Sequence, residues 1–187
     1  AHHGYSVLAI DLPGHGKSSG PALESIEEMA DWTASAIEAI SPSPVVLVGH
    51  SMGAIVALET TARNPEKITA IALAGAAIPM NVHDDLLAQT HDEPPAAIET
   101  ILNWAYSKRS QIGGMRVPGL WMLGGGRRLI ERNSDGQLYI DFKACNNYLA
   151  GFESATKIKC PTLILVGGKD KMTSPKMAKN LQQAIPH

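Results

Sequence analysis

The sequence predicts an α/β fold, with a parallel β-sheet, flanking helices and one long, mostly helical insertion. Three observations support this. Short apolar runs alternate with segments of helical periodicity. Turns rich in glycine, proline and serine separate them. Residues 76–159 then interrupt the alternation for longer than a connection in a compact sheet requires.

The elements follow in order along the chain. Tyr5–Ile10 is expected to be a strand, the Gly- and Pro-rich stretch 11–20 a loop, and Leu23–Ile40 a helix that ends at Ser41-Pro42. Three further strands and two further helices are expected at Pro44–Val48, Ile68–Leu73, Pro161–Val166, Ala54–Asn64 and Ser174–Ile185. Alternating strands and helices indicate a sheet that is buried on both faces.

Composition limits the function classes. The chain has 187 residues, 44% of them hydrophobic and 18% charged, with a formal net charge of −2. No basic field points to nucleic acid, and no apolar run approaches the length of a membrane span, so neither partner is expected. Cys145 and Cys160 show no metal-binding spacing, which favours a reduced, cytoplasmic protein without a metal.

The pentapeptide Gly49-His50-Ser51-Met52-Gly53 fits the pattern G-x-S-x-G between a predicted strand and a predicted helix. A nucleophilic serine at such a position sits on a sharp, strained turn, and side chains two residues away on either side would collide. We therefore predict a positive φ at Ser51. The backbone N–H of Met52, at a helix N-terminus, is the expected oxyanion donor.

With these residues in view, the chain resembles the α/β-hydrolase superfamily, in its esterase-like branch with a cap domain. The resemblance is carried by DLPGHGKSSG, VVLVGHSMGAIVALETTARNPEKITAIALAG and CPTLILVGGKDKMTSP. It implies a hydrolase core at 1–75 and 160–187, a cap at 76–159, Ser51 as nucleophile and Asp170 as the acid of a catalytic triad. No cofactor is implied.

Asp170 also has an argument from position, because it follows the carboxyl end of a predicted parallel strand, where such sheets bind ligands. A triad needs an acid to orient its histidine. The alternative is a loop aspartate that caps its own turn.

The family pattern implies two parts that this sequence does not show. One is a strand between Tyr5–Ile10 and Pro44–Val48, with the loop that holds the second oxyanion donor. The other is the general-base histidine, which follows one more strand after His187. The isolated chain is therefore expected to be unstable or associated, and inactive.

No histidine of the chain is expected to substitute. His15 is expected to be structural, and His50 to point into the sheet packing. The helix before His187 carries it about 18 Å away from the catalytic edge. The remaining candidates are expected at the far end of the first strand or on the surface of the insertion: His2, His3, His83 and His91.

Several residues of the insertion have two interpretations. Met80, Met115, Trp121 and Met122 either line an acyl pocket or only pack the cap. Arg127 and Arg128, with Arg132 nearby, either meet an acidic substrate or form a solvated helix face.

The sequence thus predicts a serine hydrolase that cleaves an ester or similar acyl bond of a small molecule through an acyl-enzyme. A carbon–carbon bond hydrolase or perhydrolase of the same fold, and a non-catalytic or inactive hydrolase-like fragment, are the alternatives. The sequence identifies neither the substrate nor the oligomeric state.

Overall fold

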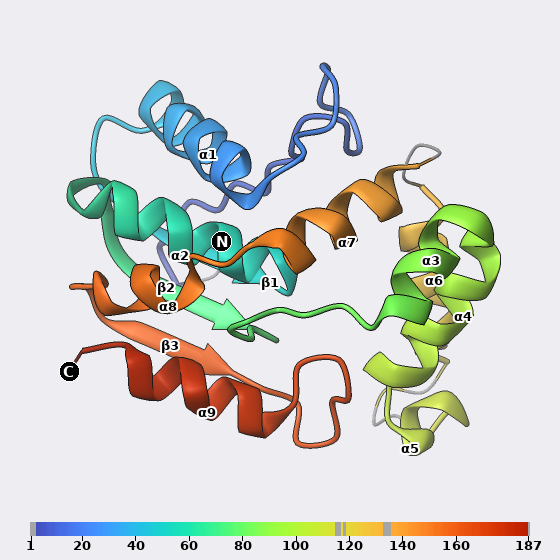
Figure 1. Ribbon diagram of the computed structural model, residues 1–187. Coiled ribbons are helices and arrows are strands. Elements are labelled where there is room, and N and C mark those ends of the chain that lie inside the picture. Colours follow the sequence, from blue (N-terminus) through green and yellow to red (C-terminus); the bar gives the residue numbers. More distant parts are fainter. Residues whose placement is uncertain (1–2, 115–116, 118, 133–135, 187) are drawn as a thin grey trace.

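The computed structural model describes residues 3–114, 117, 119–132 and 136–186. Its sheet has three parallel strands in the order β1-β2-β3: β1 (Val45–His50), β2 (Ile68–Ala74) and β3 (Thr162–Leu165). Because all three strands run in the same direction, their carboxyl ends meet at one edge of the sheet (Figure 1). The predicted α/β fold is confirmed.

The helices form two groups. Those packed on the sheet are α1 (Ile26–Ile40), α2 (Met52–Arg63), the short 3-10 helix η1 (Pro65–Lys67), α8 (Gly151–Thr156) and α9 (Pro175–Ala184). Those beyond the carboxyl edge are α3 (Asp84–Asp92), α4 (Pro94–Ala105), α5 (Lys108–Gln111), α6 (Met122–Ile130) and α7 (Gln137–Asn147). No helix that the structure describes is long and apolar enough to cross a membrane.

Local sequence accounts for several helix starts. The Ser25 hydroxyl accepts a hydrogen bond from the Glu28 N–H at 3.2 Å and caps α1. Proline at the first helical position starts α4 and α9, where its missing N–H costs nothing.

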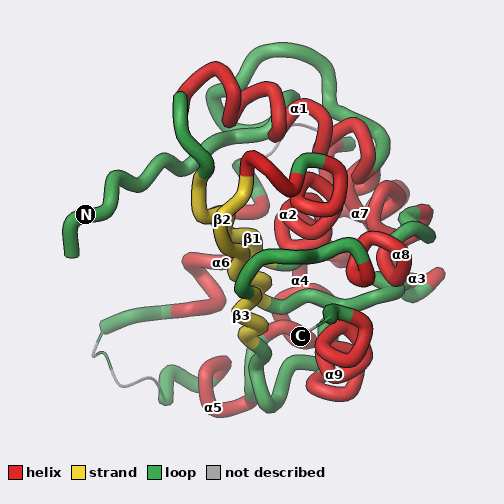
Figure 2. Tube along the Cα trace, turned by 90° about the vertical axis from the view of Figure 1, so that its left-hand side faces the viewer, coloured by secondary structure: helices red, strands yellow, loops and turns green. Residues whose placement is uncertain are grey.

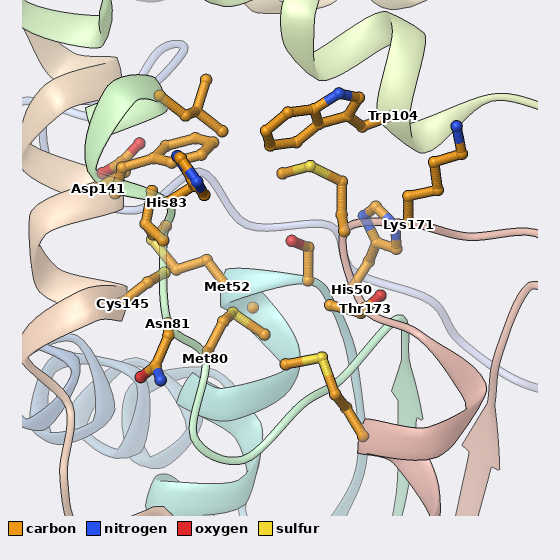
Figure 3. Close-up of a pocket in the computed structure, with 17 residues that line it drawn as sticks. His50, Met52, Met80, Asn81, His83, Trp104, Asp141, Cys145, Lys171 and Thr173 are labelled. Atoms are coloured by element: carbon orange, nitrogen blue, oxygen red, sulfur yellow. The ribbon is translucent and has the colours of Figure 1, made fainter. Parts of the chain in front are cut away.

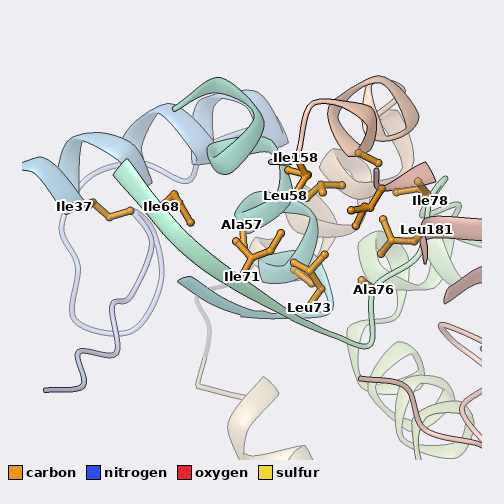
Figure 4. Packing of buried hydrophobic residues seen from close by; sticks show 13 residues of the cluster. Ile37, Ala57, Leu58, Ile68, Ile71, Leu73, Ala76, Ile78, Ile158 and Leu181 are labelled. Carbon is orange, nitrogen blue, oxygen red and sulfur yellow. The ribbon is translucent and has the colours of Figure 1, made fainter. Parts of the chain in front are cut away.

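One hydrophobic core lies on one face of the sheet. It is built from α1, α2, α8 and α9 packed on β2, with Leu58, Ile71, Leu73, Ile158 and Leu181 among its most buried side chains (Figure 4). Figure 2 shows α2, α8 and α9 on one side of the stacked strands. The helix α8 therefore packs with the core, although it lies inside the segment 76–159.

The opposite face of the sheet is open, so the expectation of burial on both faces is wrong for the described residues. Val46 and Val48 of β1 are 55% and 69% exposed, and Leu163 and Leu165 of β3 are 55% and 50% exposed. The strand register pairs Val48 with Ala72 and Ala72 with Leu163, which places these side chains on one apolar stripe.

The predicted strand at Tyr5–Ile10 is not formed. These residues have no strand pairing, and Tyr5, Val7 and Leu8 are 63–79% exposed. A strand gains its stability from ladder hydrogen bonds and cross-strand packing, and no neighbouring strand supplies either here. The apolar pattern is present in the sequence, but a pattern alone cannot provide the neighbouring strand.

A buried carboxylate that the sequence did not reveal ties four segments together. Glu59 of α2 is 4% exposed and accepts hydrogen bonds from Tyr148 Oη (2.6 Å), Ser154 Oγ (2.5 Å) and Arg63 Nε (2.6 Å). Arg63 also donates to Asp31 of α1. Burial raises the pKa of Glu59, but the three hydrogen bonds and the Arg63 charge outweigh it and leave that pKa below its ordinary value.

We expect Glu59→Gln to lower the free energy of unfolding by about 2 kcal/mol at pH 7, because it removes the charged acceptor from three hydrogen bonds, two of them buried. Because the folded pKa of Glu59 lies below its ordinary 4.5, the contribution is complete above pH 4.5 and is lost as the pH falls through the folded pKa. Denaturant unfolding at pH 7 and at pH 4 measures both effects.

The matched control is Glu38→Gln, which breaks the exposed ion pair with Lys67 and is expected to cost less than about 0.5 kcal/mol. Equal losses for the two variants would mean that Glu59 contributes no more than a surface charge.

Candidate active site

Ser51 occupies a strained turn between β1 and α2. Its backbone has φ 53° and ψ −120°, a conformation that L-residues other than glycine rarely adopt. Its N–H donates to the carbonyl oxygen of Ala74, at the end of β2, over 2.8 Å. The predicted positive φ and the strand-to-helix junction are both confirmed.

The two glycines of the motif play different roles. A Cβ on Gly49 would lie 2.0 Å from the Gly53 carbonyl oxygen, so only glycine fits at position 49. A Cβ on Gly53 would have no atom within 4 Å. The expectation that a side chain at either position would collide is therefore confirmed for Gly49 and wrong for Gly53. A Cβ at position 49 would point at the backbone of Gly53, whereas a Cβ at position 53 would point into open space.

The turn places Ser51 at the N-terminus of α2. In the described structure its side chain makes no capping hydrogen bond with the helix. The first N–H groups of a helix have no partner inside it, and the helix dipole favours negative charge beside them. The Met52 N–H is therefore available to a developing oxyanion next to the hydroxyl.

Ser51 opens into a cavity of about 580 Å³ between the sheet edge and the helices beyond it (Figure 3). The sheet side of the cavity wall consists of His50, Ser51, Met52, Gly53, Lys171, Met172, Thr173 and Met177. The other side consists of Met80, Asn81, Val82, His83, Leu86, Trp104, Asp141, Phe142 and Cys145. The cavity is therefore lined jointly by the sheet edge and by residues of the segment 76–159.

Asp170 lies in the loop after β3, at the same carboxyl edge as Ser51. Its Oδ1 accepts the N–H groups of Met172 (2.8 Å) and Thr173 (3.0 Å), and its Oδ2 accepts the Thr173 hydroxyl (3.0 Å). The carboxylate thus orders its own turn. A carboxylate has about four lone-pair sites, so one on Oδ2 is still available to another donor.

The histidines are placed differently from expectation in two cases. His50 is exposed and lines the cavity, so the expectation that it points into the sheet packing is wrong. The cause is strand alternation, which puts His50 on the same open face as Val46 and Val48. His83 also lines the cavity, although its side chain is 63% exposed, and it contacts Asp85 and the Trp104 ring.

His15 has a structural role. Its Nε2 lies 2.9 Å from Asp141 Oδ2 in α7, and its Nδ1 lies 3.1 Å from the Pro13 carbonyl oxygen. Burial raises the pKa of Asp141, against hydrogen bonds from His15 and Gln137 that lower it. His91 contacts Asp92 at the surface, while His2 and His187 lie outside the described residues. No described histidine hydrogen-bonds to Ser51 or Asp170.

The wall also contains the thiol of Cys145. Burial raises the pKa of the Cys145 thiol to about 12, so this group is a neutral part of the wall at pH 7. Among the described residues, no three His, Cys, Asp or Glu side chains are grouped in a way that could hold a metal ion.

Comparison with known proteins adds to this geometry. The family model described as "Alpha/beta hydrolase family" matches residues 1–187. The chain belongs to the α/β-hydrolase family.

Three relatives of this α/β-hydrolase illustrate the family. It is 25% identical to (E)-2-((N-methylformamido)methylene)succinate hydrolase of Acinetobacter baylyi, over 98% of this chain and 69% of that protein. It is 29% identical to pimeloyl-[acyl-carrier protein] methyl ester esterase of Chromobacterium violaceum, over 97% and 72% of the two chains. A solved thermophilic esterase superposes with a TM-score of 0.77 at 30% identity, over 94% of this chain and 66% of the esterase.

The methionines that line the cavity of this α/β-hydrolase are mostly not those proposed from the sequence. Met80 lines the cavity, whereas Met122 and the 66% exposed Trp121 do not. Met115 lies outside the described residues. The other lining methionines are Met52 at the start of α2, Met172 in the loop after β3 and Met177 in α9, all on the sheet side of the cavity. Arg127 is paired with Glu99 on the surface, away from the cavity.

Two single substitutions test the geometry of the turn. Gly49→Ala is expected to destabilise the fold by more than about 2 kcal/mol, because the new methyl group would overlap the backbone of Gly53. Gly53→Ala is expected to be neutral or stabilising by up to about 1 kcal/mol, because it replaces a helical glycine where space is open. Thermal or denaturant unfolding measures both, and equal destabilisation would contradict the described turn.

Proposed function

We propose that the protein is a serine hydrolase that cleaves an ester or similar acyl bond through an acyl-enzyme, with Ser51 as nucleophile. The observation that carries the proposal is the strained backbone of Ser51 at the mouth of the cavity. Strain of this kind persists only where the surrounding structure imposes it, and it is concentrated at functional sites. Membership of the α/β-hydrolase family, which includes esterases, supports the proposal.

In this mechanism the Ser51 hydroxyl attacks the acyl carbon and its proton passes to a histidine. The negative charge on the acyl oxygen is stabilised by the N–H of Met52 and by a second donor. The alcohol leaves with the proton from the histidine, and water then cleaves the acyl-enzyme by the same route in reverse. Following the family resemblance, we propose that the histidine and the second donor belong to segments outside these 187 residues. No described histidine hydrogen-bonds to Ser51 or Asp170.

Asp170 is proposed to orient that histidine. The three hydrogen bonds from its own loop hold the carboxylate in one position and leave a lone pair of Oδ2 for an imidazole N–H. The two interpretations of Asp170 are therefore compatible, since turn formation fixes the orientation that catalysis requires. No cofactor takes part.

The segment 76–159 is proposed to act as a cap over the site. Its side chains form one wall of the cavity, and Ser51 lines the opposite wall at the sheet edge. A wall of this kind shapes the pocket and excludes water from the acyl-enzyme. Within it, α8 is an exception, because it packs on the sheet core and anchors the segment there.

Other reactions of the same constellation are alternatives, including carbon–carbon bond hydrolysis and perhydrolysis, because a fold does not determine its chemistry. A non-catalytic or inactive protein is the alternative from a different class.

The proposed substrate is a small-molecule acyl compound, and the proposed location is the cytoplasm. Cys145 and Cys160 are both free thiols, which supports the proposed location.

A fluorophosphonate probe and short-chain p-nitrophenyl esters test the nucleophile. The protein extended by its natural flanking sequence is expected to be labelled and to turn over the ester, while its Ser51→Ala variant loses both by at least about 10³-fold. The 187-residue chain alone is expected to show neither, because no described histidine hydrogen-bonds to Ser51 and could activate its hydroxyl. Turnover that survives Ser51→Ala would remove Ser51 as nucleophile, and full activity of the 187-residue chain would place the base within it.

Asp170→Asn separates the two roles of Asp170. Its amide oxygen can still accept the Met172 and Thr173 N–H groups, so the melting temperature is expected to change little. The histidine would lose its anionic partner, and kcat is expected to fall by a factor on the order of 10³–10⁴. A folded Asp170→Asn variant with wild-type kcat would show that Asp170 only stabilises its turn and does not orient the histidine.

A further inference from the structure

Most of the cavity wall beside Ser51 is apolar. Four methionines line it (Met52, Met80, Met172 and Met177), together with Val82, Leu86, Trp104 and Phe142. A wall of this kind excludes water and lowers the local dielectric, so an ionic group at its edge interacts more strongly with a bound ligand than it would in bulk water.

Two lining residues, Lys171 and Asp141, belong to the types that are ordinarily ionised in water at neutral pH. Both carboxyl oxygens of Asp141 are engaged, because Oδ2 contacts His15 and Oδ1 accepts a hydrogen bond from Gln137 over 2.7 Å. Its 8% exposure places it in the wall and not at a free surface. Asp141 is therefore occupied by structural partners.

Lys171 is in the opposite situation. It is exposed at the cavity, and among the described residues no carboxylate lies within the 4.0 Å of an ion pair with its ammonium group. Figure 3 shows it on the opposite side of the view from Asp141, which also lines the cavity. Within the part of the chain that the structure describes, Lys171 is therefore a cation on a largely apolar wall without an ion-pair partner.

The backbone of Lys171 is fixed on both sides. Its N–H donates to the Trp104 carbonyl oxygen at the end of α4 over 3.3 Å, which joins the loop after β3 to the proposed cap. The next two N–H groups are held by Asp170 Oδ1. The stem of the lysine therefore starts from an ordered position, and less conformational entropy is lost when its ammonium group meets a ligand.

We propose that Lys171 selects substrates that carry a carboxylate in addition to the scissile acyl bond, such as half-esters of dicarboxylic acids. The apolar part of the substrate lies against the methionine-lined wall, and its carboxylate pairs with the Lys171 ammonium group. This inference rests on the proposed hydrolase function of the same site and names its substrate class.

The test compares matched pairs of esters in the enzyme extended by its natural flanking sequence. The carboxylate is placed on the acyl side in the p-nitrophenyl half-esters of glutaric and adipic acid, against p-nitrophenyl valerate and hexanoate. It is placed on the leaving group in 4-acetoxybenzoate, against phenyl acetate. The measured quantity is the ratio of kcat/KM for the anionic ester to that for its neutral partner.

The expected ratio is above one in at least one pair of esters. It is expected to fall by about tenfold or more in Lys171→Met, because this variant loses one charge-assisted contact with the substrate carboxylate. Lys171→Arg is expected to restore most of it, and added salt to reduce it. The matched control is Lys169→Met, since Lys169 is an exposed lysine of the same loop that does not line the cavity, and its ratios are expected to stay at wild type.

Binding to the Ser51→Ala variant provides a readout that does not depend on turnover. Monoethyl glutarate is expected to bind more tightly than ethyl valerate by calorimetry or NMR titration, and Lys171→Met is expected to remove the difference.

Ester turnover with no charge preference in either assay would overturn the role of Lys171 and leave the hydrolase proposal standing. Charge-selective binding without any turnover would overturn the hydrolase proposal and leave Lys171 as an anion site. Equal loss in Lys169→Met would also overturn the inference, because it would reflect only the charge of the loop.

Discussion

The close approach of the backbone at positions 49 and 53 is the constraint on which the site depends. A strand can turn directly into a helix at Ser51 only if no side chain stands at position 49, where a methyl group would overlap the Gly53 carbonyl group. The hydrogen bond from the Ser51 N–H to Ala74 then fixes the turn to the neighbouring strand. As a result, a hydroxyl, a helix N-terminus and the carboxyl edge of the sheet come together within a few residues.

The same helix that starts at this turn is held in place by a polar network. Glu59 lies on α2 and is hydrogen-bonded to Tyr148 and Ser154, where the chain returns from the helices beyond the sheet edge. Arg63 extends the network to α1. A buried carboxylate is costly unless its hydrogen bonds are complete, so the network favours one arrangement of α1, α2 and α8. Glu59 therefore holds both the helix that begins at Ser51 and the segment in which the proposed cap returns to the core.

The cavity combines walls of different origin. Its sheet side comes from the end of β1, the start of α2, the loop after β3 and the start of α9. Its other side comes from α3, α4 and α7 together with the segment that leads into α3. Direct links between the core and the helices beyond the edge include the His15–Asp141 contact and the bond from the Lys171 N–H to the Trp104 carbonyl oxygen. The shape of the cavity is therefore sensitive to how the helices beyond the edge sit on the core.

By itself, the sequence determined the α/β fold class, three of the four expected strands, the helical character of the long insertion and the turn at Ser51, because each depends on local pattern. Alternating apolar runs, helix periodicity and a glycine at position 49 act over a few residues, and the structure reproduces them.

Only the tertiary structure decided the features that need a partner distant in the chain. Tyr5–Ile10 has the pattern of a strand but no neighbouring strand with which to pair, and His50 faces the open side of the sheet because the residues described here cover only the other face. Glu59, Asp141 and Lys171 look alike in the sequence, as single charged residues. In the structure, Glu59 and Asp141 are buried among hydrogen-bond partners, whereas Lys171 lines the cavity without an ion-pair partner among the described residues. The effective strength of a charge depends on its surroundings in space rather than on its neighbours in sequence.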